Sequence, residues 1–360
     1  MIIRKVKKND YRNITLLFIR NKLEFMCQLT WENLWNNPYL NRKKNKNLGW
    51  VLVFKKKIVG HIGYYPSIYL YKNNKISCSV LHGWVVDKKF RTISISLIQK
   101  YLSTKNDFFL GTTNNKHAGS IMKSFSFSEV PSEGLNSASL IILNPSNFLK
   151  YYFRHKNIIF KQFLIYSLSY ILNLLMFKNI NKWKKIKVKN KIYNLKNFDK
   201  NFQNFCQKYK KNNSQKLHLT KTPLWLNWFL KVKIKNKNII ISACKKGKKI
   251  VGYSILFIKN KQGFKTAHLV DLISLSEDNQ FLIDLTKHNI NLAYKKGCNF
   301  FDYRNASLEK RKILKPFSAI EIKLKYNSFY YKSNNDKINN ILKKSDTWDP
   351  SSLDGDILLN

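Results

Sequence analysis

The sequence predicts an α/β fold in which one mixed-sheet architecture is used twice. Its 360 residues are enough for two domains of ordinary size. The first third alternates strand and helix patterns, which is typical of a mixed sheet covered by helices. The segment KKKIVG at 55–60, which follows a strand, recurs about 190 residues later as KKIVG at 248–252, and this indicates an internal duplication.

The elements of the first domain follow from local patterns. A short strand at 2–5 precedes a helix that Asp10 begins, with apolar residues such as Ile14 and Leu17 at helical spacing. Later strands end in Lys/Asn turns, which favour hairpins. The remaining elements are expected in this order: strands at 50–54, 58–71 and 76–87, a helix at 94–102, a strand at 108–111 and a helix at 116–125.

The pattern returns after a basic connector at 182–191. A helix at 197–211 and an aromatic-rich segment at 222–230 precede strands at 239–244, 245–257 and 267–275, a helix at 279–295, a strand at 299–303 and a helix at 307–314. We therefore expect domains at 1–145 and 192–360, joined by an apolar helix and a basic connector at 146–191.

Lysine dominates the charge. The chain carries 66 Lys and Arg against 20 Asp and Glu, a formal net charge of +46, but only eight of the basic residues are Arg. Surfaces that read nucleic acid favour Arg, whose planar guanidinium matches phosphate and guanine. Lys, Asn and Ile are all abundant, as an AT-rich coding sequence favours, so we do not expect dedicated nucleic-acid binding. Hydrophobic residues at 44% and aromatic residues at 14% exclude a disordered chain.

The five cysteines are scattered, with no CxxC and no His at metal-ligand spacing. This argues against a disulfide framework and structural zinc, so we expect no metal site. Buried thiols in a reducing cytoplasm are the simplest interpretation. The N-terminal MIIRKVKKNDYRN has no apolar core of a signal peptide, which agrees with a cytoplasmic location.

An apolar stretch at 158–177 has three interpretations. Its uninterrupted part, 163–177, is shorter than the roughly 20 residues that a spanning helix needs. We expect a buried helix between the domains. Because basic residues such as Arg154 and Lys178 flank it on both sides, a helix lying on an anionic membrane surface, and thus peripheral membrane contact, stays open. A transmembrane span is the third interpretation.

The segment after the strand at 76–87 carries the most specific pattern. It reads Val86-Asp87-Lys88-Lys89-Phe90-Arg91-Thr92-Ile93-Ser94-Ile95-Ser96. This resembles V-x-P-x-Y-R-G-x-G-x-G/A, a motif of the GNAT superfamily of acyl-CoA-dependent N-acyltransferases. The segments IRKVKKNDYRNITLLF and VFKKKIVGHIGYYP resemble the family's opening strand and helix and its second and third strands. The resemblance covers residues 1–145.

The resemblance implies where an acyl-CoA, such as acetyl-CoA, would bind as co-substrate. Strand backbone around Val86 would contact the acyl-CoA, and backbone N–H groups at the following helix N-terminus would approach the pyrophosphate. Small residues leave room for that approach, and serines stand where the family has glycines. The implied cofactor-binding residues are Val85, Val86, Arg91, Thr92, Ser94, Ser96 and, from the downstream match Asn115-Lys116-His117-Ala118, Asn115.

The implied chemistry has one gap. Met122 stands where the family often has a tyrosine general acid, and a thioether cannot donate a proton to the departing thiolate. Either water or another residue supplies that proton, or this half does not catalyse.

The second half resembles the divergent GNAT-like domain of tandem acyltransferases, including the FemAB-like group. KKIVGYSILF, AHLVDLIS and LAYKKGCNFFDY carry this resemblance. The expected pyrophosphate loop is absent, because SEDNQFLIDL follows the strand and its Glu277 and Asp278 would repel phosphate. The second domain is therefore not expected to bind CoA in the family's manner.

Two residues are predicted to be catalytic. His82 lies four residues before Val86, on the same face of its strand, and a neutral imidazole there could accept the proton of an amine. A core histidine is the alternative. Asp271 is the carboxylate inside an apolar strand, where it needs a partner or a purpose. It is expected either to serve the substrate amine or to be a structural hydrogen-bonded residue. His61 and Trp84 could line the acceptor cleft, although packing roles are the simpler interpretation.

The resemblance thus implies an N-acyltransferase that moves an acyl group, expected to be acetyl, from CoA to an amine. The acceptor is expected to be a small-molecule or lipid-linked amine, for which the resemblance suggests an amino sugar of a surface polysaccharide. One alternative is a FemAB-like transferase that uses aminoacyl-tRNA. The other is a degenerate, non-catalytic GNAT-like binding module.

Overall fold

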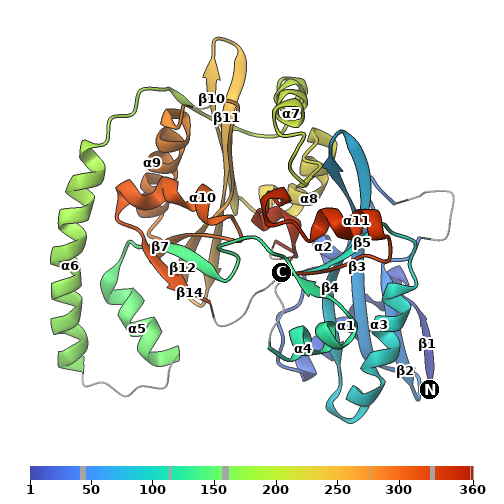
Figure 1. Ribbon diagram of the computed structural model, residues 1–360. Coiled ribbons are helices and arrows are strands. Elements are labelled where there is room, and N and C mark those ends of the chain that lie inside the picture. Colours follow the sequence, from blue (N-terminus) through green and yellow to red (C-terminus); the bar gives the residue numbers. More distant parts are fainter. Residues whose placement is uncertain are drawn as a thin grey trace. The chain divides into compact units, whose positions relative to one another are not determined.

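The chain forms two compact units, which are interleaved along the sequence. The computed structural model describes residues 1–40, 46–112, 116–155, 162–276, 278–324, 329–356 and 358–359 (Figure 1). Unit 1 comprises Met1–Ser132, Asn213–Val232 and Tyr326–Asn360, and unit 2 comprises Glu133–Asn212 and Lys233–Lys325. Each unit holds a mixed sheet with helices, so the predicted α/β class with two mixed sheets is confirmed.

The sheet of unit 1 has the order β1-β2-β3-β4-β5-β15-β6, with β9 paired to β3. β4 and β5 run parallel, and the other neighbours run antiparallel. Its strands are β1 (Ile2–Lys5), β2 (Gly49–Phe54), β3 (Lys57–Tyr71), β4 (Asn74–Val86), β5 (Phe108–Gly111), β6 (Ser128–Glu129), β9 (His218–Leu219) and β15 (Tyr330–Lys332).

Both faces of this sheet are covered. Strand alternation sends Val51 and Val85 into a core that includes Ile14, Leu17 and Trp31 from helices α1 and α2. The next residues along the strands, Leu52 and Val86 among them, enter a second core with helix α3. The helical segments that contribute wholly or mainly to unit 1 are η1 (Lys8–Asp10), α1 (Tyr11–Arg20), α2 (Gln28–Leu34), η2 (Lys88–Ile93), α3 (Ser94–Leu102), α4 (Lys116–Ser124), α8 (Pro223–Lys235), α11 (Asp336–Leu342), η4 (Ser345–Thr347) and η5 (Ser352–Asp354).

Unit 2 repeats the same plan. Its sheet has the order β8-β10-β11-β12-β13-β7-β14, and its one parallel pairing between described strands joins β12 and β13. Its strands are β7 (Ser137–Ile142), β8 (Ile192–Leu195), β10 (Ile239–Lys246), β11 (Lys249–Lys261), β12 (Phe264–Ser274), β13 (Phe300–Arg304) and β14 (Ile320–Lys323). Its helical segments are α5 (Pro145–His155), α6 (Gln162–Lys185), α7 (Lys200–Asn212), α9 (Gln280–Lys295), α10 (Leu308–Arg311) and η3 (Lys312–Phe317).

The repeated KKIVG segments occupy equivalent hairpins. In unit 1, Val53 pairs with Ile58 and Leu52 with Gly60, so Val59 is the extra residue of a bulge. In unit 2, Lys245 pairs with Ile250 and Cys244 with Gly252, which makes Val251 the extra residue. A bulge at the same place in the same motif supports the duplication that the sequence indicates.

In each sheet, the sixth strand comes from the other half of the sequence: it is β15 in unit 1 and β7 in unit 2. We call this arrangement the strand exchange. After β6, the chain leaves unit 1, and β7 pairs with β13 and β14 of unit 2. After β14, the chain returns, and β15 takes the equivalent position between β5 and β6. The compact units therefore differ from the linear domains expected at 1–145 and 192–360. The reason is that strand pairing joins segments far apart in the sequence, which local periodicity does not record.

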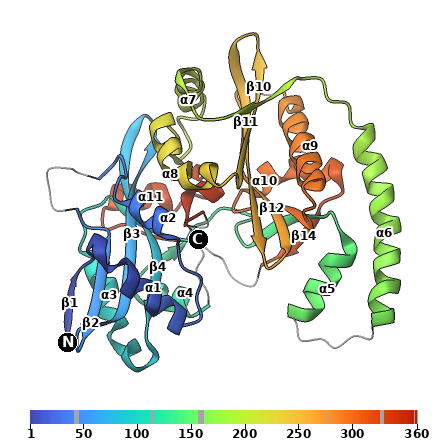
Figure 2. The same ribbon diagram turned by 180° about the vertical axis from the view of Figure 1, so that it is seen from behind.

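The apolar stretch forms one helix, α6, which lies beside α5 (Figures 1 and 2). Phe163, Tyr170 and Phe177 are exposed, so the expectation that this is a buried helix is wrong. Among the described residues, no helix combines the length and apolar character needed to cross a membrane. The first residues of the stretch, 158–161, lie outside the described residues.

Candidate active site

Unit 1 contains a cavity of about 320 Å³ beside the carboxyl-terminal half of β4. It is formed by α1, the α1–α2 connector, α2, strands β3 to β5, α4 and the C-terminal segment. Its walls are mainly aromatic and aliphatic, with a few polar groups, which is the usual character of a small-molecule site. The lining residues are Tyr11, Ile14, Thr15, Phe18, Leu23, Glu24, Phe25, Met26, Trp31, His61, Leu81, His82, Gly83, Trp84, Thr112, Ala118, Asp356 and Leu359.

An irregularity in β4 opens the strand toward this cavity. His61 pairs with Val85, whereas Gly63 pairs with His82, so the β3–β4 register shifts between them. Gly83 has a φ of +57°, in the left-handed region that favours glycine. β5 accompanies β4 as far as the pairing of Leu81 with Gly111. The strand segment predicted to contact acyl-CoA therefore follows a bulge and lies beyond the paired part of β5.

Two buried imidazoles lie together at this bulge. The ring centroids of His61 and His82 are 6.2 Å apart, and Phe18 and Tyr65 pack around them. The His61 Nδ1 lies 2.7 Å from the carbonyl oxygen of Gly83. Because a carbonyl only accepts, Nδ1 must carry the proton, which leaves the His61 Nε2 lone pair available. Neither His61 Nε2 nor either nitrogen of His82 has a partner among the described residues.

Burial keeps both rings neutral. It lowers the pKa of His61 from 6.5 to about 4, although the Gly83 carbonyl and the negative charge of Asp10 oppose the shift. Burial, with a smaller effect of His61, lowers the pKa of His82 to about 3. At neutral pH the cavity therefore presents unprotonated imidazole nitrogens, whose lone pairs can accept a hydrogen bond.

The ionisable side chains that line the cavity differ from those that dominate the chain. Although 66 residues of the protein are Lys or Arg, none of them is among the described residues that line this cavity. Two carboxylates, Glu24 and Asp356, do line it, and Thr112 donates a 3.5 Å hydrogen bond to Asp356. A cavity with carboxylates and neutral imidazoles suits a ligand that carries an amine.

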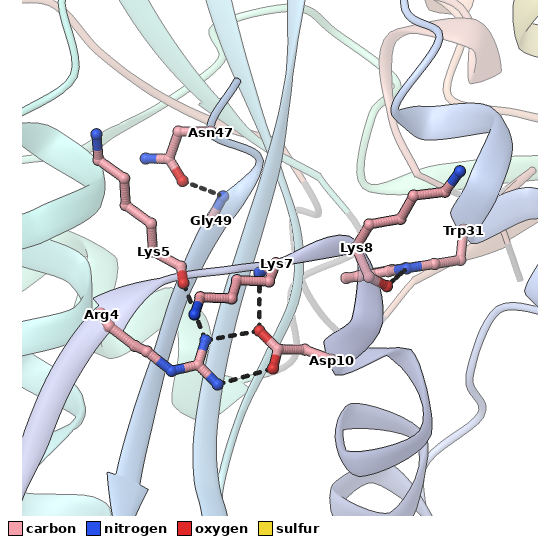
Figure 3. Close-up of polar contacts among 8 residues, drawn as sticks. All are labelled: Arg4, Lys5, Lys7, Lys8, Asp10, Trp31, Asn47 and Gly49. Atoms are coloured by element: carbon pink, nitrogen blue, oxygen red, sulfur yellow. Dashed lines mark hydrogen bonds and ion pairs between the residues drawn. The ribbon is translucent and has the colours of Figure 1, made fainter. Parts of the chain in front are cut away.

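The wall formed by α1 is held by a network at the end of β1. Arg4 donates two hydrogen bonds of 2.7 Å to the Asp10 carboxylate, and the backbone N–H of Lys7 donates a third (Figure 3). Burial alone would raise the pKa of Asp10, but the bonds from Arg4 and Lys7 outweigh it and hold that pKa below its usual range. The indole of Trp31 donates to the Lys8 carbonyl at 2.8 Å, which holds a second wall residue (Figure 3).

The C-terminal segment forms another wall of the cavity. Tyr65 donates to the Gly355 carbonyl at 3.0 Å, and Tyr69 donates to the Asp354 carboxylate at 2.6 Å. A Cβ on Gly355 would lie 2.1 Å from the Thr112 hydroxyl oxygen, so only glycine allows this approach. These contacts bring Asp356 to the cavity from a position 274 residues beyond His82 in the numbering.

The residues predicted to bind acyl-CoA surround the end of β4. Val85 and Val86 are buried on opposite faces of the sheet. Lys88–Ile93 form the 3-10 helix η2, on which Arg91 and Thr92 are exposed. Ser94 is buried and donates to the Arg91 carbonyl at 2.6 Å, and Ser96 is half-buried in the first turn of α3. Asn115 lies outside the described residues.

Asp271 belongs to unit 2, so the structure does not bring it together with His82 within one unit. It is fully buried, and the Tyr253 hydroxyl donates a hydrogen bond to its carboxylate. The strand register makes this pair equivalent to His61 and Gly83, because Gly252 pairs with Ser274 as Gly60 pairs with Val86. Burial, followed by the charge of Asp271, raises the pKa of Tyr253 well above its usual range. Met122 is fully buried in the core under α4.

The sequence suggested that His61 could line a cleft, and it does line the cavity, but Asp356 and Glu24 were missed as cavity residues. His61 sits in VGHIG on β3, and a sequence pattern does not record the register shift that places it beside Gly83. Asp356 belongs to the segment Leu353-Asp354-Gly355-Asp356, whose cluster of acids in a basic chain was the available signal.

Comparisons with solved structures define the class of fold. No family model matches the chain, and no curated protein matches it. A probable N-acyltransferase from Enterococcus faecalis V583, described as a conserved protein of unknown function, has a TM-score of 0.59 at 12% identity, over 92% of this chain and 72% of that one. A GCN5-related N-acetyltransferase from Anabaena variabilis has a TM-score of 0.54 at 10% identity, over 93% and 73%.

A third structure is similar over a comparable length. The Saccharomyces cerevisiae N-myristoyltransferase with bound myristoyl-CoA has a TM-score of 0.54 at 10% identity, over 92% of this chain and 78% of that one. These likenesses agree with the mixed sheets described above and with the sequence motifs at the end of β4. The chain therefore has the fold of the GNAT-type N-acyltransferases.

Proposed function

We propose that the protein is an acyl-CoA-dependent N-acyltransferase whose acceptor amine occupies the cavity of unit 1. The observation that carries this proposal is the composition of the cavity. It combines two neutral imidazoles and two carboxylates with no Lys or Arg among its described lining residues, in a chain of net charge +46. An amine is the ligand that such a site would attract.

The proposed reaction uses the imidazole pair to remove a proton. The neutral amine attacks the thioester carbonyl carbon, the C–N bond forms, and the carbonyl electrons move to oxygen. The ammonium group of this intermediate passes a proton to an imidazole nitrogen, the electrons on oxygen re-form the carbonyl as the C–S bond breaks, and CoA leaves as a thiolate. The imidazolium then releases its proton to solvent. His61 is suited to accept the ammonium proton because its Nδ1–H is held by the Gly83 carbonyl and its Nε2 has no hydrogen-bond partner among the described residues. His82, the base predicted from the sequence, is the second candidate. The thiolate takes its proton from solvent, since Met122 is buried and cannot supply one.

The acyl-CoA would bind at the end of β4. Backbone at Val85 and Val86 would face the acyl group, and Arg91, Thr92, Ser94 and Ser96 would surround the pyrophosphate. Exposure of the guanidinium of Arg91 and the hydroxyl of Thr92 supports this assignment. The similar yeast enzyme holds myristoyl-CoA, which agrees with a thioester donor. Acetyl is the acyl group that we propose here.

The acceptor that we propose has an amine on a ring or an apolar body. The aromatic walls, Trp31 and Trp84 among them, would pack against such a body, and Asp356 or Glu24 would attract the amine. An amino sugar of a surface polysaccharide meets this description, as does an arylalkylamine. Asp271 is paired with Tyr253 in unit 2, so the support for a direct catalytic role of Asp271 is weaker than that for His82.

Binding of the donor is tested by thermal unfolding with and without acetyl-CoA. We expect the ligand to raise the Tm of the wild type, and Arg91→Ala and Thr92→Glu to abolish that shift. Arg12→Ala, which removes an exposed arginine from α1, is the control and should keep the shift. Without any shift for the wild type, and with salt-sensitive tRNA binding instead, the FemAB-like alternative would be favoured.

Catalysis is tested by release of the CoA thiol with hexosamines and arylalkylamines as acceptors. We expect His61→Gln to lower kcat by at least about 100-fold, the effect of losing a general base. His82→Gln tests the second candidate, and His288→Gln in unit 2 is the control that should retain the rate. Binding of acetyl-CoA without turnover of any amine would leave the binding-module alternative in place of the enzyme.

A further inference from the structure

Helix α6 carries its apolar side chains on its solvent face. Phe163, Tyr166, Tyr170, Leu174 and Phe177 follow one another at intervals of three and four residues, so they form one stripe along the helix. Each is at least half exposed, from 50% for Leu174 to 77% for Phe163. At 1.5 Å per residue the stripe is about 21 Å long.

The inner face of α6, which packs on the rest of unit 2, has a polar residue at its centre. α6 lies beside α5 (Figures 1 and 2) and also contacts η3. Ser169 is 4% exposed, while Ile165 and Leu172, one turn away on the same face, are half-buried. An ordinary surface helix buries its large apolar residues and exposes its polar ones. In α6 the inner face carries apolar residues as well, and Ile171 and Leu175 beside the stripe are also exposed, which indicates that another apolar medium covers the outer side of the helix.

The charge around the helix points to an anionic medium. Residues 134–198 contain 12 Lys and Arg and no Asp or Glu. Lys178, Lys185, Lys187 and Lys189 are exposed at the carboxyl end of the stripe. Near its other end, the Lys150 ammonium lies 5.7 Å from the centroid of the Tyr166 ring. The apolar stripe therefore has cations beside both ends and no carboxylate in the surrounding sequence.

We propose that α6 docks on an anionic lipid surface, with the stripe between the head groups and the acyl chains. Apolar side chains that enter the interface and lysines that meet anionic head groups are the two components of such binding. Nucleic acid would pair with the lysines but would leave the stripe in water. A protein partner would have to supply carboxylates around an apolar groove. The lipid surface satisfies both features with one chemistry.

The test is sedimentation of the full chain with vesicles of phosphatidylcholine alone or of an equal mixture with phosphatidylglycerol. We expect binding to the mixed vesicles that weakens as salt rises. Tyr170→Ser with Leu174→Ser should lower the bound fraction roughly tenfold. The control is the same pair of substitutions elsewhere, Tyr294→Ser with Leu224→Ser, which removes exposed residues from α9 and α8 and should change little.

The electrostatic part has its own matched pair. Lys185→Glu with Lys187→Glu should abolish the preference for anionic vesicles, whereas Lys343→Glu with Lys344→Glu, an equal change of charge in unit 1, should keep it. Equal binding of all four variants would overturn the proposal. So would a wild type that binds no vesicles and forms a dimer that the stripe variant breaks, since the stripe would then pack on a second copy. Binding of tRNA but not vesicles would also overturn it. Acetyl-CoA binding, measured in parallel, separates these outcomes from failure of the proposed function.

Discussion

The chemistry of the candidate site depends on how His61 and His82 are packed. A Cβ on Gly63 would lie 2.5 Å from the His82 Cε1, so the ring of His82 lies directly on the glycine backbone. The carbonyl of Gly83 selects the tautomer of His61. Gly63 has no side chain that would collide with the His82 ring, and Gly83 can adopt a positive φ. The two glycines therefore leave space for both imidazoles, which larger side chains at these positions would fill.

The buried imidazoles should make the protein sensitive to acid. The pKa values in the folded state, about 4 for His61 and about 3 for His82, lie below the ordinary value of 6.5 expected after unfolding. At pH values between 4 and 6.5, the two histidines are protonated in the unfolded chain but remain neutral in the folded chain. The free energy of unfolding should therefore fall as the pH drops from 6.5 toward 4, by roughly 1.4 kcal/mol per pH unit for each histidine.

Urea unfolding at several pH values measures this effect. Glutamine does not titrate, so His82→Gln should reduce the slope of unfolding free energy against pH over this interval. His117→Gln, at an exposed position on α4, should leave the slope unchanged. If the wild type, His82→Gln and His117→Gln all gave the same slope, burial would not be lowering the pKa of the His82 ring.

At the scale of elements, the C-terminal segment acts as part of the core of unit 1. Leu353, Asp354 and Leu359 are buried, although the described part of the segment forms short 3-10 turns instead of longer helices or strands. Side-chain hydrogen bonds replace regular secondary structure in holding it. The Asp354 carboxylate accepts from Tyr69 and from the Ser351 N–H, at 2.6 Å each. Burial raises its pKa, opposed in part by these bonds and by Lys221.

Removing one of these donors should be costly. Tyr69→Phe leaves the buried carboxylate with one donor fewer, and we expect a loss of about 1–3 kcal/mol in the free energy of unfolding. Tyr71→Phe, the same substitution at the half-buried end of the same strand, should change it by less than about 0.5 kcal/mol. Similar losses for the two variants in urea unfolding would contradict the anchoring role of Tyr69.

At the scale of the whole molecule, the exchange of β7 and β15 makes each unit depend on both halves of the chain. Unit 1 needs β15 and the C-terminal segment, and unit 2 needs β7 from the first half. Duplication explains why both strands fit, since each takes the position that the other would take in a linear arrangement.

A fragment of residues 1–145 should therefore fail to fold as a cooperative unit. It lacks β15, so β5 and β6 lose the strand that joins them, and it carries β7 without its partners β13 and β14. Exposed strand edges favour aggregation. In the full chain, hydrogen exchange in low urea should protect Tyr331 together with β5 and protect Ile141 together with β13. Two results would contradict the strand exchange. One is cooperative unfolding of the isolated fragment, and the other is hydrogen exchange of the Ile141 amide at the same rate as the amides of β6.

Much of the architecture was predictable because it follows local rules. Alternation along the strands at 58–71 and 76–87, and the Lys/Asn turn between them, determined a long hairpin. The IVG repeat determined two equivalent hairpins, and the residues at 86–96 indicated the class of fold. The prediction that His82 shares a strand face with Val86 is wrong. His82 lies opposite Gly63 and Val86 lies opposite Gly60, three residues apart on β3, because the extra residue of the β4 bulge interrupts the alternation.

Tertiary structure alone decided the strand exchange, the tautomer of His61, the partner of Asp271, the approach of Asp356 to the cavity and the outward direction of the apolar stripe on α6. Each of these depends on which distant segment lies opposite a residue. A sequence pattern reports the periodicity of one element, but the free energy of pairing, burial and hydrogen bonding is determined by contacts between residues far apart in the chain.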